Sequence, residues 1–136
     1  MSVVLRVGRY EALRPIASGG MATVYLGRAE GARGFERQVA IKAMHPHLAE
    51  DPEFVTMFLD EARLAARIRH PNVVATLDVV ATDGELFLVM DYVQGESLAR
   101  LVRRRNVAPR IVASIICGAL HGLHAAHEAR DERGEP

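Results

Sequence analysis

The segment Gln38-Val39-Ala40-Ile41-Lys42-Ala43-Met44 sets the fold class of this chain. Its alternation predicts a β-strand with Val39 and Ile41 on one face and Ala40, Lys42 and Met44 on the other. Ala40 leaves room on its face for a flat group, and Lys42 reaches past it. Strand periodicity alone is typical of a solvated lysine on an edge strand, so a role for Lys42 depends on its surroundings.

A glycine-containing connection precedes this strand. Residues 10–17 and 23–29 have the pattern of two strands, and Ser18-Gly19-Gly20-Met21-Ala22 between them suits a hairpin. Adjacent glycines let the backbone approach a ligand closely and present N–H groups to phosphate. Two glycines between strands are also typical of a simple turn, so the loop carries weight only together with other features.

A helix is predicted after the strand, from residue 52 to about residue 68. Asp51 is a suitable cap, and Pro52 suits the first helical position. The helix should stop before Pro71, because the residue before a proline is disfavoured in a helix. Residues 45–47 between the strand and the helix are interpreted as a loop.

One carboxylate on this helix has no local partner. Phe58, Glu61 and Ala65 share a face by their spacing, and no basic residue lies three or four positions from Glu61. Asp60, in contrast, has Arg63 three residues on. Because burying an unpaired charge is costly, Glu61 either pairs with a remote cation or lies solvated at the edge of the apolar stripe. Periodicity leaves both alternatives open.

Two more predicted strands bring the number along the sequence to five. Residues 73–81 and 86–90 have strand patterns, and Asp83-Gly84 between them is a strong signal for a two-residue hairpin. Residue Lys42 then lies on a central strand of this order. Central placement favours a functional cation over a solvated edge lysine.

The last third of the chain is predicted to be helical, over residues 97–105 and from 109 to about 127. Residues 111–120 are apolar on nearly every side, which predicts a helix buried all round, with Cys117 as a small buried side chain. Such a helix needs neighbours on all sides, and the chain ends before supplying them. We therefore expect the sequence to be the front part of a larger domain.

Composition excludes several classes of function. Of 136 residues, 17 are basic and 17 acidic, so the chain lacks the bulk positive charge that favours nucleic acid or anionic lipid. One cysteine allows neither an internal disulfide nor a cysteine metal site. The N-terminus is not a secretory signal, and no apolar run reaches the length of a spanning helix, so a cytoplasmic location is expected. His121, His124 and His127 have poor geometry for a shared metal.

The identity of the basic residues adds to the case for Lys42. It is the only lysine, because the other 16 basic residues are arginine. A lysine ammonium is a compact point charge that suits a phosphate oxygen, whereas a guanidinium is a wide fork. This feature also favours a functional cation at Lys42 over a solvated lysine.

Five motifs occur in order on suitable elements: residues 19–25, residues 39–42, Glu61, residues 70–74 and residues 88–93. From about residue 10 onward the chain resembles the N-terminal lobe of the protein kinase family, most closely the bacterial serine/threonine protein kinases of eukaryotic type. The resemblance implies an α+β fold. A five-stranded antiparallel sheet, one helix and the hinge would occupy residues 1–93, and the first two helices of an incomplete C-lobe would occupy residues 94–136.

The resemblance also implies an ATP site. Lys42 would hold the α- and β-phosphates, and Glu61 would pair with Lys42. The loop would cover the phosphates, two side chains would lie above the adenine, one would guard the back of the pocket, and the hinge would offer backbone hydrogen bonds. The residues so assigned, besides Lys42 and Glu61, are Ala17, Ser18, Gly19, Gly20, Met21, Ala22, Val24, Ala40, Met90, Asp91 and Val93. The substrates would be ATP and a protein, and the ligands of Mg²⁺ are expected beyond residue 136.

Two departures from the family pattern leave alternatives open. Ala17 and Ala22 stand where the glycine loop of the family has its first and third glycines, and a methyl at each place should stiffen the loop. The H-R-D and D-F-G motifs are absent, and Ala129-Arg130-Asp131 is interpreted as a solvated loop. We expect no phosphotransfer from this chain alone. The alternatives are a pseudokinase or kinase-like scaffold, and an unrelated α+β binding protein in which Lys42 and Glu61 pair structurally.

Overall fold

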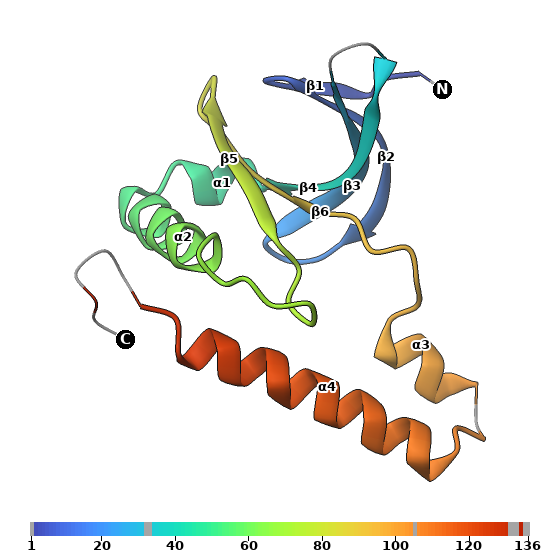
Figure 1. The fold of residues 1–136 in the computed structure, drawn as a ribbon. Coiled ribbons are helices and arrows are strands. Elements are labelled where there is room, and N and C mark those ends of the chain that lie inside the picture. Colours follow the sequence, from blue (N-terminus) through green and yellow to red (C-terminus); the bar gives the residue numbers. More distant parts are fainter. Residues whose placement is uncertain (1, 32–33, 105, 131–133, 135–136) are drawn as a thin grey trace.

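The computed structural model describes residues 2–31, 34–104, 106–130 and 134. An antiparallel sheet of six strands, in the order β1-β2-β3-β4-β6-β5, curls at one end, and helices lie beside and below it (Figure 1). The elements described are β1 (Leu5–Val7), β2 (Tyr10–Ser18), β3 (Ala22–Glu30), β4 (Glu36–Met44), α1 (Pro46–Ala49), α2 (Pro52–Ala65), β5 (Thr76–Thr82), β6 (Glu85–Asp91), α3 (Leu98–Arg103) and α4 (Pro109–His127).

The predicted strands are confirmed, and one short strand was missed. Asp83 and Gly84 have φ of 50° and 74°, the positive values of a type I′ turn, so they join β5 to β6 as expected. The missed strand is β1, which pairs with the start of β2 through a turn at Gly8. Three residues are too few for an alternation signal, so only the pairing with β2 reveals this strand.

Each face of the sheet supports a separate apolar core. The concave face carries Val39 and Ile41 of β4, which are fully buried with Tyr10, Phe87 and Val89 because the curled sheet closes over them. The opposite face packs against α2, where a second cluster is buried: Ala22, Met44, Phe58 and Leu86. The alternation predicted for residues 38–44 therefore divides β4 between two cores.

The helix predicted from residue 52 begins where expected and ends earlier. The Asp51 carboxylate accepts from the amides of Glu53 (3.0 Å) and Phe54 (3.4 Å), which confirms the predicted cap. The helix ends at Ala65, because the amides of residues 67 and 68 bond three residues back instead of four. Part of the segment interpreted as a loop belongs to the short helix α1, which is a single turn that begins at Pro46.

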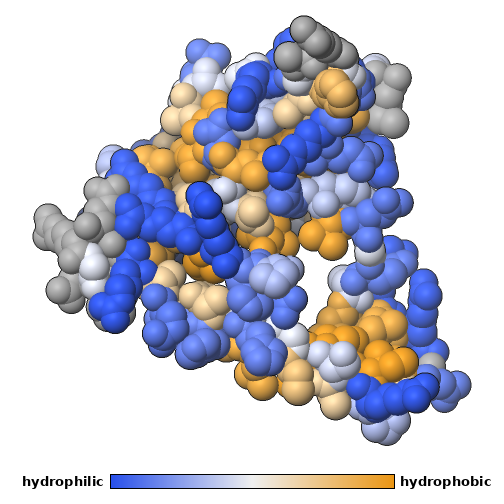
Figure 2. All heavy atoms as spheres, viewed as in Figure 1, coloured by the Kyte–Doolittle hydropathy of each residue, from blue (hydrophilic) through white to orange (hydrophobic). Residues whose placement is uncertain are grey.

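The apolar surface of α4 is exposed, which corrects the expectation of burial. Gly122 is buried beneath the loop before β5, and the Asn72 side chain donates to the Gly118 carbonyl at 3.0 Å. Cys117 is exposed, as are the other apolar side chains of that portion facing away from the loop: Ile111, Val112, Ile116 and Leu120. Figure 2 shows hydrophobic surface in this region. No described element covers this side of the helix.

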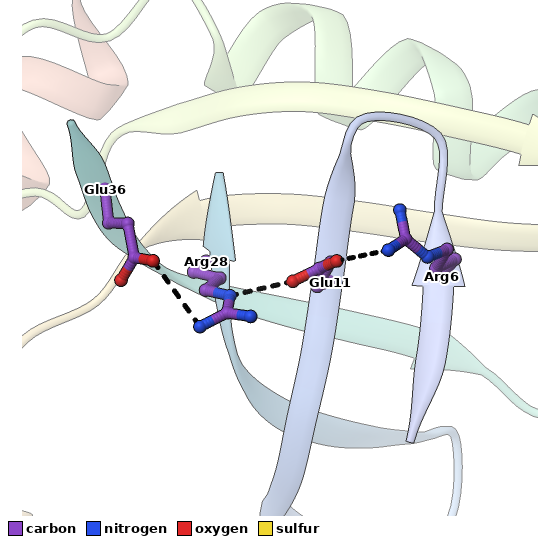
Figure 3. Close-up of polar contacts among 4 residues, drawn as sticks. All are labelled: Arg6, Glu11, Arg28 and Glu36. Carbon is purple, nitrogen blue, oxygen red and sulfur yellow. Dashed lines mark hydrogen bonds and ion pairs between the residues drawn. The ribbon is translucent and has the colours of Figure 1, made fainter. Parts of the chain in front are cut away.

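A network of ion pairs around a buried carboxylate, which sequence reasoning missed, links four strands (Figure 3). Glu11 of β2, with its side chain 4% exposed, pairs with Arg6 of β1 at 2.6 Å and with Arg28 of β3 at 2.7 Å. Arg28 also reaches Glu36 of β4 at 3.5 Å. The hydrogen bond to Glu11 raises the pKa of Arg28 above its ordinary value.

Glu11→Ala is expected to lower the free energy of unfolding by about 1.5–3 kcal/mol, because hydrogen bonds to a charged group are lost inside the sheet. Thermal or urea unfolding of the variant measures the change. The matched control is Glu36→Ala, which removes one longer contact of an exposed carboxylate and should change stability little. Equal stability of the two variants would contradict a structural role for Glu11.

Candidate functional site

Several of the residues assigned by sequence lie on one face of the sheet, here called the Lys42 face. Lys42 of β4 is directly opposite Val24 of β3 and Leu88 of β6. Ala40, two residues before Lys42, is opposite Leu26 and Met90. Directly paired residues of antiparallel strands project to the same side, so Val24, Ala40, Lys42 and Met90 form one surface.

The Lys42 face combines an apolar floor with the ammonium of Lys42. Ala40 is buried and small, Val24 and Met90 are half-buried, and Lys42 is also half-buried. Within the part of the chain that the structure describes, no carboxylate lies within ion-pair distance of the Lys42 ammonium. A half-buried ammonium without a carboxylate partner favours binding of an external anion.

The glycine loop closes the hairpin between β2 and β3 beside this face. The Gly19 amide donates to the Ala22 carbonyl at 3.0 Å, and Met21 is exposed. A Cβ atom added to Gly19 or Gly20 would meet nothing within 4 Å, and neither glycine has a positive φ. The fold itself therefore does not require glycine at either position, whereas close approach of a ligand to the backbone would.

The two alanines that replace family glycines are strand residues. Ala17 pairs with Val24 directly after a register shift between Pro15 and Ala17, and Ala22 pairs with Met44 in regular register. Neither has a positive φ, so the methyl groups cause no backbone strain. Ser18 pairs with Thr23 across the hairpin. The open tip of the loop is thus restricted to Gly19, Gly20 and Met21.

The segment predicted to be the hinge begins at the end of β6. The Asp91 amide already donates to the Ala75 carbonyl at 3.0 Å, and the Asp91 carboxylate pairs with Arg37. The Asp91 backbone can therefore bind a ligand only through its carbonyl oxygen, which would accept a hydrogen bond from it. Val93 is 66% exposed, beyond the strand, so its backbone lies outside the sheet.

Glu61 and Lys42 are not brought together. Helix α2 buries Phe58 and Ala62, and the Phe54 ring stacks on Phe58 at 6.2 Å between centroids. This buried stripe leaves Glu61 at its exposed edge, and among the described residues no ion pair joins Glu61 to Lys42. Of the two alternatives for Glu61, the solvated one is found in this structure. Asp60 pairs with Arg63 at 3.2 Å, as predicted.

His45 is a contact residue of the glycine loop that sequence reasoning missed. Its Nε2 lies 2.9 Å from the Gly19 carbonyl oxygen, and its backbone amide donates to the Met21 carbonyl at 3.0 Å. Only the pairing of β3 with β4 brings residue 45 to the loop, so no local pattern could have indicated it.

The described parts of the chain contain no cluster of three or more His, Cys, Asp or Glu side chains that could hold a metal ion. No described helix is both long and apolar enough to cross a membrane. The Lys42 face offers a flat apolar floor and one ammonium, with the glycine loop beside them. Such a surface fits a ligand with an apolar ring at one end and phosphate at the other.

Comparison with known proteins agrees with this chemistry. The sequence model of the family described as protein kinase domain matches residues 10–130. Tyrosine-protein kinase MasK of Myxococcus xanthus is 42% identical over 134 residues, which cover 95% of this chain and 21% of MasK. Serine/threonine-protein kinase PkaB of Streptomyces coelicolor is 39% identical over 122 residues, which cover 89% of this chain and 28% of PkaB.

Solved structures give the same fold. The crystal structure of the Mycobacterium tuberculosis PknI kinase domain matches with a TM-score of 0.77 at 28% identity, over 94% of this chain and 51% of that domain. A second crystal structure of the same domain matches with a TM-score of 0.75 at 30% identity. The chain thus spans about half of the solved domains and a smaller share of the two relatives above.

Proposed function

This chain belongs to the protein kinase family, and we propose that its Lys42 face binds ATP for transfer of the γ-phosphate to a protein hydroxyl. Adenine would lie against Val24 and Ala40, with Met90 behind it. The Lys42 ammonium would hold the α- and β-phosphates, and the amides of the glycine loop would cover them. Catalysis of this kind consists mainly of positioning the phosphates and stabilising their charge.

One observation carries the proposal. Lys42 is the only lysine of the chain, and it lies half-buried, without an ion-pair partner among the described residues, beside Ala40 and Val24. A lysine that forms a structural ion pair would have a carboxylate beside it, and Lys42 has none among the described residues. A phosphate ligand supplies the missing negative charge, and Ala40 provides the space for the flat base.

The proposal includes an ion pair between Glu61 and Lys42 in the ATP-bound protein. Because Glu61 is exposed in this structure, its carboxylate would have to move toward Lys42 to form this ion pair. The H-R-D and D-F-G motifs of the family are not in this sequence. The base and the ligands of Mg²⁺ would therefore come from residues outside this chain, and we assign Mg²⁺ no ligand within it.

We infer serine and threonine as the acceptor residues. PkaB of Streptomyces coelicolor and PrkC of Bacillus subtilis are named serine/threonine-protein kinases, whereas MasK is named a tyrosine-protein kinase. The test is phosphoamino acid analysis after incubating the full-length protein with labelled ATP and Mg²⁺. Phosphoserine or phosphothreonine supports the inference, and phosphotyrosine alone would overturn it. Because ATP is a cytoplasmic substrate, the proposal also places this part of the protein in the cytoplasm.

Gly19→Ala and Gly20→Ala should each weaken ATP binding by about ten-fold, because a methyl group keeps a phosphate from one backbone amide. The free energy of unfolding should change by no more than about 0.5 kcal/mol, since the space around both glycines is open. Calorimetric titration with ATP and thermal unfolding of the full-length variants measure the two effects.

Gly95→Ala is the matched control, since the added methyl again meets nothing within 4 Å, but the residue follows β6 and is not part of the glycine loop. Its ATP affinity should match that of the parent protein. ATP affinity unchanged in both loop variants would remove the glycine loop from the proposed site.

A further inference from the structure

His45 makes two separate contacts with the tip of the glycine loop. Its ring Nε2 lies 2.9 Å from the Gly19 carbonyl oxygen, so the ring donates a hydrogen bond when Nε2 carries a proton. Its backbone amide donates to the Met21 carbonyl at 3.0 Å. The two carbonyls flank Gly20, so one residue fixes both sides of the tip.

These contacts set the directions of two loop amides. In a planar trans peptide, the carbonyl and the following N–H point in opposite directions. When the Gly19 carbonyl points to His45, the Gly20 amide points away from it, and the Met21 carbonyl fixes the Ala22 amide in the same way. His45 is extended and three residues beyond Lys42, so strand alternation places its side chain on the face opposite Lys42. The Gly20 amide is thereby directed toward the Lys42 side, whereas the Ala22 amide points across the hairpin, on the side where the Ala22 carbonyl accepts from the Gly19 amide.

His45 is itself well anchored. Its carbonyl accepts from the amides of Leu48 (3.0 Å) and Ala49 (3.4 Å) at the start of α1. Its ring stacks on His47 with 6.0 Å between centroids and an angle of 19°. The ring therefore holds the loop from a fixed point at the end of β4.

We propose that His45 is a positioning residue for the ATP phosphates, acting through the Gly20 amide. This inference rests on the proposed function of the Lys42 face. It predicts that the contact matters for ligands that carry phosphates and not for adenosine, which reaches the apolar floor alone.

Two substitutions separate the ring contact from the rest of the residue. In Gln the side-chain amide nitrogen is as many bonds from Cβ as Nε2 is in His, so His45→Gln can still donate to Gly19. In Asn the nitrogen is one bond nearer, so His45→Asn loses the contact. Asn is also a favoured N-cap residue, so α1 should not be weakened.

The experiment measures Kd for ATP and for adenosine in the full-length protein and both variants. His45→Asn should weaken ATP binding by about three- to ten-fold and leave adenosine binding unchanged, while His45→Gln stays within about two-fold of the parent for both ligands. Unchanged ATP affinity in His45→Asn, or an equal loss for adenosine, would overturn the proposal. A parent protein that binds no ATP would instead refute the proposed function itself.

Discussion

Lys42→Met should lower phosphotransfer from ATP by about 10²–10³-fold in the full-length protein, the loss typical when one preorganised charge-stabilising donor is removed. Met keeps the length and apolar stem of the side chain, so the β4 strand and its neighbours should remain in place. What disappears is the ammonium, the half-buried cation for which the described structure offers no carboxylate partner. Initial rates with labelled ATP and a protein acceptor measure the effect.

Lys42→Arg is the matched control, because it keeps the positive charge but replaces a compact ammonium with a wide planar fork. We expect Lys42→Arg to be impaired as well, though less than Lys42→Met, and to melt within a few degrees of the parent. A Lys42→Met variant with parental rates would show that the lysine is a structural or solvated residue, and the phosphate role would fail.

Gly27→Ala should destabilise the sheet by about 1–3 kcal/mol, the cost of forcing an extra methyl into a packed core. Gly27 of β3 is buried between β2 and β4. An added Cβ would lie 2.6 Å from Ile41 Cδ1 and 2.8 Å from the Glu11 carbonyl oxygen. The Ile41 side chain is fully buried and the Glu11 oxygen belongs to the backbone, so neither can move cheaply.

Thermal unfolding measures this loss as a drop of several degrees in Tm. The same chemical change at Gly95 serves as the control, because the added methyl there meets open space and should leave Tm within about a degree of the parent. A Gly27→Ala variant that melts with the parent would mean that β2, β3 and β4 do not pack as closely as described.

The parts of the fold that local sequence determines were predictable. The Asp83-Gly84 turn follows from residues that accept positive φ, and the start of α2 follows from the Asp51 cap. β1 and α1 were missed because both are very short. β1 has three residues and α1 is a single helical turn, so each depends on contacts with the elements around it. Elements of that length carry no periodicity to detect.

The candidate site also contains residues that local sequence could indicate and residues whose surroundings depend on tertiary packing. Alternation placed Ala40 and Lys42 on one face, and the pairing of β4 with β3 and β6 adds Val24 and Met90 to it. The surroundings of Glu61 depend on how α2 is rotated against the sheet, which is set by the packing of Phe58 and not by helix periodicity. His45 reaches the glycine loop through residues distant in sequence, so no local pattern indicated it.

The exposed helix α4 shows where sequence interpretation overreached. Residues 111–120 were expected to be buried because they are apolar around the helix, and Cys117 with them. Burial requires a covering element as well as an apolar sequence, and in the described chain Gly122 is the residue of α4 that is buried. Composition thus identified a surface suited to burial, without identifying what covers it.

The most direct test of the central claim uses the single lysine. An acyl phosphate derivative of ATP carries an acyl group on its terminal phosphate, and an amine held at the phosphates attacks the acyl carbon, forming an amide and releasing ATP. The full-length protein is treated with this reagent, and the peptide containing Lys42 is examined by mass spectrometry with and without excess ATP. We predict acylation of Lys42 that ATP suppresses. Absence of labelling at Lys42, or labelling that excess ATP leaves unchanged, would contradict the claim that this lysine binds the phosphates of ATP.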